Sequence, residues 1–151
     1  MTRINYEMVR LRLQKSVFLL NPNYQQPPQG EVIALGLNLR NKGEFFQNNS
    51  MANFIQCFQT RGGGAESPFS LEVETAALFS LSAPVPPGEH QAFIHQIFPQ
   101  MVFPHTREYI AEITRRGGFP PLLLNLGLFQ DQRKSDSGSA TEFLGGSKWI
   151  H

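Results

Sequence analysis

The chain has 151 residues, of which 40% are hydrophobic and 17% are charged, with a net charge of +1 at neutral pH. This length predicts one domain with a substantial core, and a charged fraction below the usual value of about 25% indicates surface reserved for subunits or ligands. A net charge so close to zero argues against binding of nucleic acid or membranes by electrostatic attraction alone.

The cysteine content and the hydropathy of the N-terminus indicate the cellular compartment of the protein. The single cysteine, Cys57, excludes an intrachain disulfide framework and is typical of a reducing environment. The apolar run at 17–20 is too short for a signal peptide or for a segment inserted in a membrane. We therefore expect a cytoplasmic protein.

The N-terminal residues 6–20 alternate between apolar and polar side chains, with Val9, Leu11 and Leu13 on one side. A period of two predicts a strand with one solvent-exposed face. The alternation breaks at 15–18, which predicts a bulge. Residues 21–30 contain three prolines and a glycine, and they predict a crossover loop rather than a tight hairpin.

Three further strands are predicted at 31–40, 46–60 and 69–81, with a turn at 41–45 and a loop at 61–68. In the last strand one side carries four residues of the expected inner face, Phe69, Leu71, Val73 and Thr75. Four strands that are joined mainly by short connections favour an antiparallel sheet.

Beyond residue 88 the apolar period becomes helical, with Ile94, Ile97, Phe98 and Met101 on one face. Pro99 and Pro104 are disfavoured inside a helix, where a proline costs about 3 kcal/mol. We therefore predict two helices, at 89–98 and 104–116. Pro104 would take the first helical position of the second helix and Gly117 its C-terminal cap. The packing stripe of this second helix is expected to be Thr106, Tyr109, Ile110 and Ile113.

Strands followed by helices predict an α+β domain. We place this domain at 1–130. The polar, glycine-rich residues 131–151 are expected to form a flexible C-terminal tail.

No pattern in the sequence predicts catalysis, a cofactor or a metal. His90 and His95 are five residues apart, which places them about 140° apart around a helix and prevents a shared metal site. Glu108 and Glu112 have helical spacing, but Arg115 and Arg116 follow them and favour a solvated, salt-bridged surface. The glycine-rich segment at 61–67 lacks the Gly-Lys-Ser/Thr ending of a phosphate-binding loop. Cys57 is expected in the core.

Residues 98–125, FPQMVFPHTREYIAEITRRGGFPPLLLN, resemble the signature region of the SecB family of protein-export chaperones. In that family a segment ending in Phe-Pro-x-x-Arg-Glu leads the main helix, and Arg-Gly-x-Phe-Pro-x-Leu-x-Leu follows it. The matching positions here are Phe103, Pro104, Arg107, Glu108, Arg116, Gly117, Phe119, Pro120, Leu122 and Leu124. Residues 67–81 also resemble the family's fourth strand, and the similarity extends from residue 6 to residue 129.

The resemblance implies a four-stranded antiparallel sheet with C-terminal helices packed on one face. It implies that subunits pair edge to edge into eight-stranded sheets and that two such dimers form a homotetramer, a dimer of dimers. The implied activity is that of an ATP-independent holdase, which is not an enzyme. Such a holdase keeps unfolded preproteins competent for export and passes them to the SecA motor.

The resemblance also implies a hydrophobic groove for clients, for which the candidate residues are Phe18, Tyr24, Phe119, Leu122 and Leu124. Pro120 and Pro121 remove backbone donors, so this segment can display apolar side chains without recruiting another strand. The same side chains also fit a role in packing over the domain's own sheet.

Two features depart from the family. Glu72 matches an acidic position that docks SecA, but Lys15 and Leu19 stand where the family has acidic residues. The residues after 126 give few helical signals where the family has a C-terminal helix. Two alternatives therefore stay open: a solitary SecB-like chaperone for another client, such as the antitoxin of a toxin–antitoxin system, and an RNA- or metabolite-binding α+β domain.

Overall fold

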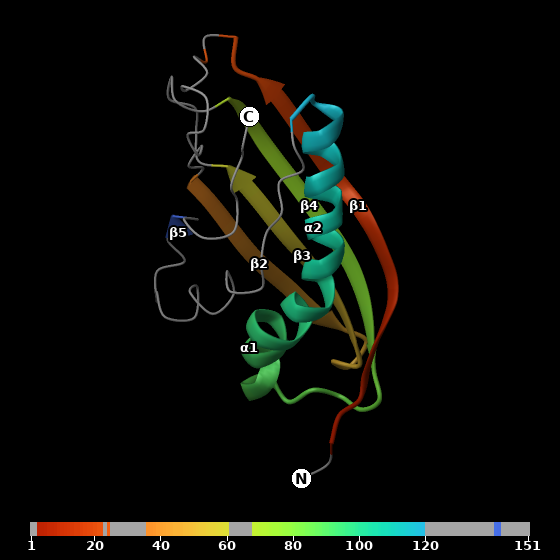
Figure 1. Ribbon diagram of the computed structural model, residues 1–151. Helices are drawn as coiled ribbons and strands as arrows, with labels where there is room; N and C mark the ends of the chain where they lie inside the picture. The colour runs from red at the N-terminus through yellow and green to blue at the C-terminus, as the bar shows by residue number, and fades with distance from the viewer. Residues whose placement is uncertain (1–2, 23, 25–35, 61–67, 120–140, 143–151) are drawn as a thin grey trace.

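A computed structural model of the chain describes residues 3–22, 24, 36–60, 68–119 and 141–142. Its four long strands form an antiparallel sheet, as predicted, and a fifth strand of two residues pairs with β2 (Figure 1). The strand order is β1-β4-β3-β2-β5. The strands are β1 at Tyr6–Leu20, β2 at Gly36–Phe46, β3 at Met51–Thr60, β4 at Phe69–Leu81 and β5 at Thr141–Glu142. Most of the predicted tail, 131–151, lies outside the described residues.

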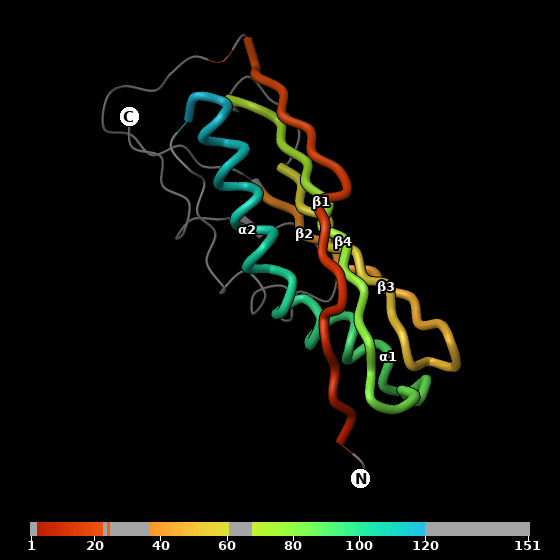
Figure 2. The backbone as a smooth tube through the Cα atoms, turned by 90° about the vertical axis from the view of Figure 1, so that its right-hand side faces the viewer, coloured from red at the N-terminus to blue at the C-terminus, as the bar shows by residue number. Residues whose placement is uncertain are grey.

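The described helices lie on one face of the sheet, which we call the inner face (Figure 2). A 3₁₀ turn at Pro87–Glu89 leads into α1 at His90–Ala92, a π-helical turn at Phe93–Ile97 and α2 at Phe98–Arg116. These segments follow one another without a gap, so the predicted division into helices at 89–98 and 104–116 is wrong. The predicted packing of helices on one face of the sheet is confirmed, but the helical region consists of one long helix, α2, preceded by short helical turns.

The prolines that motivated the division are accommodated in two ways. Pro99 lies at the start of α2, directly after the π-helical turn, so the residue without an N–H stands where the helical hydrogen-bond pattern changes. Pro104 lies inside α2. Its neighbours Val102 and Phe103 are completely buried on the sheet, and each such side chain contributes about 1.5–3 kcal/mol, which offsets the cost of the proline.

The predicted turn at 41–45 is wrong, because these residues belong to β2. The glycine that favoured a turn, Gly43, instead leaves room for Ile94 of the π-helical turn. A Cβ at Gly43 would lie 2.9 Å from Cγ1 of Ile94. The chain turns later, where Gln47, Asn48 and Asn49 all have positive φ. As a result β3 begins at Met51 rather than at residue 46.

The bounds of β1 and β4 agree with the prediction. Buried residues alternate along β4, as expected. Along β1 the pairing with β4 shifts twice, between Met8 and Arg10 and between Leu13 and Lys15, close to the predicted bulge. Because of the first shift, Val9 does not share a face with Leu11 as predicted. Val9 is exposed, whereas Met8 and Leu11 pack against buried residues. The second shift turns Phe18 to the inner face.

Two apolar clusters fill the space between the sheet and the helices. The closed cluster contains Ala52, Phe54, Ala77, Phe79, Leu81, Val85, Phe93, Ile94, Phe98 and Val102. The open cluster contains Leu37, Leu39, Phe58, Phe69, Leu71, Val73, Phe103 and Ile110. Between them lies a buried polar layer, in which Thr106 Oγ1 is 2.7 Å from Gln56 Oε1 and 2.9 Å from Thr75 Oγ1.

Candidate functional site

Three aromatic rings from distant parts of the chain meet where α2 ends. Phe18 comes from β1, Phe69 begins β4, and Phe119 follows α2. The ring centroids of Phe18 and Phe119 lie 5.0 Å and 5.1 Å from that of Phe69, and 6.3 Å from each other. Phe69 is fully buried, whereas Phe18 and Phe119 are only half-buried. The outer two rings therefore form an apolar surface at the edge of the open cluster.

Tyr24 lies against the same cluster and is also partly buried. Burial raises the pKa of its hydroxyl group. The start of the crossover is tied to the start of β4, because the Asn21 amide donates to the Pro68 carbonyl at 3.0 Å and the Tyr24 amide donates to the Asn21 carbonyl at 3.2 Å. The structure thus brings together Phe18, Tyr24 and Phe119, three of the five residues predicted to line a groove. Leu122 and Leu124 lie outside the described residues.

Two residues of α2 join this surface that the predicted site did not include. Tyr109 and Ile113 are partly buried against the open cluster. The sequence places them on the packing stripe of the helix, and their spacing of four residues puts them on one face. This spacing was the sequence signal that could have identified the two residues. It does not show, however, which residues of the packing stripe stay partly exposed in the folded chain.

The direction of Phe119 is set by the way α2 ends. The Gly118 amide donates to the Arg115 carbonyl at 3.1 Å, and the Phe119 amide donates to the Thr114 carbonyl at 3.1 Å. Gly118 has a φ of +91°, which a glycine adopts at little cost. This pattern is a Schellman motif, and it turns the chain back over the last helical turn. The predicted C-terminal cap at Gly117 is confirmed.

The predicted docking residue Glu72 lies on the opposite side of the sheet, which we call the outer face. Its carboxylate Oε1 is 2.9 Å from Nζ of Lys15. The pKa of Glu72 is lowered mainly by the hydrogen bond from Lys15 and, to a smaller extent, by a hydrogen bond from Gln59. The pKa of Lys15 is raised by the same hydrogen bond to Glu72 and by the negative charge of Glu72. Lys15 therefore not only replaces an expected acidic residue but also neutralises the retained one.

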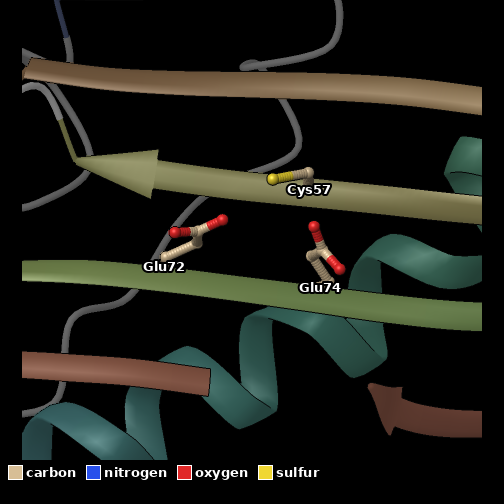
Figure 3. Close-up of side chains that lie close together, drawn as sticks. All are labelled: Cys57, Glu72 and Glu74. Carbon is tan, nitrogen blue, oxygen red and sulfur yellow. The ribbon is translucent and has the colours of Figure 1, made fainter. Parts of the chain in front are cut away.

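One set of three potential metal ligands occurs among the described residues, also on the outer face (Figure 3). Ligand atoms of Cys57, Glu72 and Glu74 lie within 4.8 Å of one another. Burial, and then the charge of Glu74, raises the pKa of the thiol, which favours the protonated form that binds metals poorly. Lys15 already pairs with Glu72, so we assign no metal to this set. Cys57 is buried, as predicted.

The large exposed hydrophobic side chains of the described residues all belong to β1. They are Tyr6, Val9, Leu13, Leu19 and Leu20, with exposed fractions between 39% and 62%. Among the described strands, β1 lies at the edge of the sheet, since it pairs with β4 alone. Among the described helices, none has the length and apolar character needed to cross a membrane.

Comparison with known proteins gives consistent matches. Residues 19–134 match the family model described as preprotein translocase subunit SecB. The chain is 40% identical over 137 residues to the protein-export protein SecB of Hyphomonas neptunium, covering 88% of this chain and 82% of that protein. A protein-export protein SecB of Cereibacter sphaeroides is 30% identical over 90 residues, which span only 54% of its length.

The fold is similar to that of a solved SecB-like chaperone from Mycobacterium tuberculosis. That structure contains the chaperone in complex with a ChAD peptide from an antitoxin. The TM-score is 0.62 at 20% identity, over 80% of this chain and 90% of the other. A protein of unknown function from Streptococcus agalactiae has a TM-score of 0.53 at 9% identity. Both similarities concern the fold alone.

Proposed function

Since the chain belongs to the SecB family of preprotein translocase subunits, we propose that it is an ATP-independent holdase for unfolded preproteins. The observation that carries this proposal is the half-buried aromatic surface of Phe18, Tyr24 and Phe119 at the end of the open cluster. A holdase binds and releases unfolded chains without making or breaking a covalent bond, so it needs apolar surface rather than catalytic groups. Because its clients are bound before export, the proposed compartment is the cytoplasm.

The size of this surface fits weak, unselective binding. Burial of one large apolar side chain contributes about 1.5–3 kcal/mol, so four contacts give about 6–12 kcal/mol before costs. The ordering of an unfolded client reduces this sum considerably. Several such surfaces on one assembly would raise the affinity for a long client through multivalency.

We propose that the assembly is a homotetramer, a dimer of dimers, in which β1 strands of two copies pair edge to edge. Two properties of β1 support this arrangement: it is an edge strand, and it carries the exposed apolar residues of the described chain. Light scattering should give a tetramer at micromolar concentration. Val9→Lys together with Leu13→Lys should dissociate it, whereas Asn53→Lys, an exposed change on the central strand β3, should not. A monomeric wild-type protein would contradict the proposal.

We further propose that SecA docks on the outer face at Glu72, with reduced affinity because Lys15 holds that carboxylate. Titration of the protein with SecA tests this directly. Replacement of Lys15 and Leu19 by acidic residues should strengthen binding, and Glu72→Gln should weaken it. If none of these changes alters SecA binding, the docking site lies elsewhere.

A second client class is favoured by one observation, the antitoxin peptide bound to the SecB-like chaperone of similar fold. The same apolar surface would serve an antitoxin as well as a preprotein. Identification of the polypeptides that co-purify with the tagged protein separates the two: preproteins with their signal peptides support export, and a single antitoxin partner supports the alternative.

The decisive experiment is suppression of aggregation. A chemically denatured protein is diluted into buffer with and without the purified chain, in the absence of nucleotide, and light scattering is followed. We expect suppression at near-stoichiometric concentration. Unchanged aggregation would exclude a holdase for either client class.

A further inference from the structure

Two adjacent glycines end α2, and the structure requires them for different reasons. Gly118 has a φ of +91°, and a Cβ added to it would meet nothing within 4 Å. Gly117 has a φ of −77° and a ψ of 0°, a conformation open to any residue. A Cβ at Gly117, however, would overlap Cζ and Cε1 of Phe18 and would lie 3.1 Å from Cε2. Gly118 is therefore needed for the backbone turn, and Gly117 for the space that it leaves to an aromatic ring.

The ring of Phe18 occupies this space because its backbone is fixed by the sheet. Phe18 pairs with Leu71 across β1 and β4, after the bulge that turns it to the inner face. From there its ring reaches the end of α2 and packs on Phe69, with the two rings tilted by 31°. The helix end cannot retreat easily, since the amides of residues 117, 118 and 119 are all bonded to carbonyls of the last turn.

We propose that Gly117 is a positioning residue for the client surface: by lacking a side chain, it holds the Phe18 ring beside Phe119 as one continuous apolar surface. This inference rests on the proposed holdase function. With a methyl group at 117, the ring has to leave the helix end. It is half-buried on an edge strand, so the free direction is toward solvent, in another staggered rotamer. The ring then separates from Phe119, and a client meets two isolated patches instead of one surface.

The test uses the full chain and a fluorescein-labelled, reduced and carboxymethylated lactalbumin as a permanently unfolded client. Gly117→Ala should raise the Kd for this client about three- to tenfold, the value of one lost aromatic contact. Gly43→Ala is the matched control: its added Cβ would lie 2.9 Å from Cγ1 of Ile94 in the closed cluster, so it should lower the melting temperature and leave the Kd nearly unchanged. Equal Kd values for the wild type and Gly117→Ala would overturn the inference.

A double-mutant cycle separates positioning from general destabilisation. Phe18→Ala removes the ring that Gly117 accommodates, so Gly117→Ala in that background should add no further loss of client affinity. The double variant also avoids the overlap, so it should fold even where Gly117→Ala alone does not. A further loss in the double variant would contradict the inference. Failure of the wild type to bind the client at all would instead remove the proposed function, and the inference with it.

Discussion

The closed and open clusters lie beneath the same helix and contain the same residue types, yet they end differently. In the closed cluster the rings of Phe79 and Phe98 stack at 4.1 Å, and Phe54 and Phe93 lie within 6 Å of Phe98. A partly buried ring, Phe45, also lies at the edge of the closed cluster, but it stacks on His90 with the ring centroids 4.0 Å apart. At the edge of the open cluster the rings of Phe18 and Phe119 remain partly exposed. Phenylalanine thus contributes mainly to stability at one end of α2 and is available for binding at the other.

Backbone connections explain the difference. At the closed end the amides of Leu81, Ser82 and Val85 donate to carbonyls of Ser50, Asn5 and Asn49, which ties the strand ends to the segment before the helices. Val85 and the residues of the π-helical turn then cover the rings. At the open end, the described backbone bonds outside the sheet and the helix termination are those that join residues 21, 24 and 68. Among the described residues, the open end therefore has fewer backbone connections than the closed end.

The largest expected effect is on stability at the closed end. Phe98 is completely buried and contacts four other phenylalanine rings, so Phe98→Ala should lower the free energy of unfolding by about 3–5 kcal/mol. Urea denaturation followed by circular dichroism measures this loss. Phe18→Ala is the matched variant at the open end, and it should cost less stability but more client affinity. A comparable loss of stability in both would remove the distinction between the clusters.

The next effect concerns binding at the open end. Phe119→Asp should weaken client binding by about 30- to 100-fold, because it removes an apolar contact and places a charge where a client has to lie. The loss of stability should be smaller than the loss of binding free energy, since the ring is only half-buried. Client titration and urea denaturation are measured on the same samples. Phe119→Leu should retain most of the affinity, and equal losses of fold and binding in Phe119→Asp would assign Phe119 to the core.

The polar layer between the clusters gives an intermediate effect. Thr106→Val keeps the shape of the side chain but removes the hydroxyl that bonds Gln56 and Thr75, which leaves buried polar atoms unsatisfied. The expected cost is about 1–3 kcal/mol in the free energy of unfolding. Thr106→Ser retains the hydroxyl and should recover most of this loss. Client affinity should not change, and an affinity change equal to that of Phe119→Asp would mean that the two clusters are coupled.

The sequence predicted the elements whose pattern is local. The strands β1 and β4 were placed at their observed bounds: alternation begins β1 and a proline-containing loop follows it, and proline- or glycine-rich segments flank β4 on both sides. The misplaced turn and the divided helix have another cause. Gly43 is a residue typical of turns, but here it lies in a strand and leaves space for Ile94. Pro104 is typical of a helix start, but here it lies inside α2 beside buried neighbours. Both depend on packing between segments that are distant in sequence.

The candidate site shows the same limit. The resemblance named Phe18, Tyr24 and Phe119, and the structure places them around one cluster. The role of Gly117 was predicted only as a helix cap, because its contact with Phe18 depends on the register of β1 against β4. That register has two shifts: the break in alternation at 15–18 predicted the second one approximately, and no sequence pattern indicated the first. Lys15 was likewise known as a change of charge, but not as the partner of Glu72.

The smallest expected effect comes from the Lys15–Glu72 pair, which lies on the outer face, on the opposite side of the sheet from the open cluster. The pKa of Glu72 is lowered from 4.5, so the stabilisation by its charge is present above pH 4.5 and is lost as the pH falls through the lowered value. The pKa of Lys15 is raised from 10.5, so its contribution is present below pH 10.5 and is lost as the pH rises through the raised value.

Lys15→Met should therefore return the pKa of Glu72 toward 4.5, which a pH titration of its carboxyl carbon signal by NMR measures. Stability at neutral pH should change little, because the pair lies at the surface, with Lys15 exposed and Glu72 partly exposed to solvent. Glu72→Gln is the control, since it removes the titrating carboxylate. In the Glu72→Gln background, the chains with Lys15 and with Lys15→Met should show the same dependence of stability on pH in the acidic range. Client affinity should be the same in all these variants, because binding is proposed to depend on the inner face alone. If Lys15→Met changed client affinity as much as Gly117→Ala, the two faces of the sheet would have to act together.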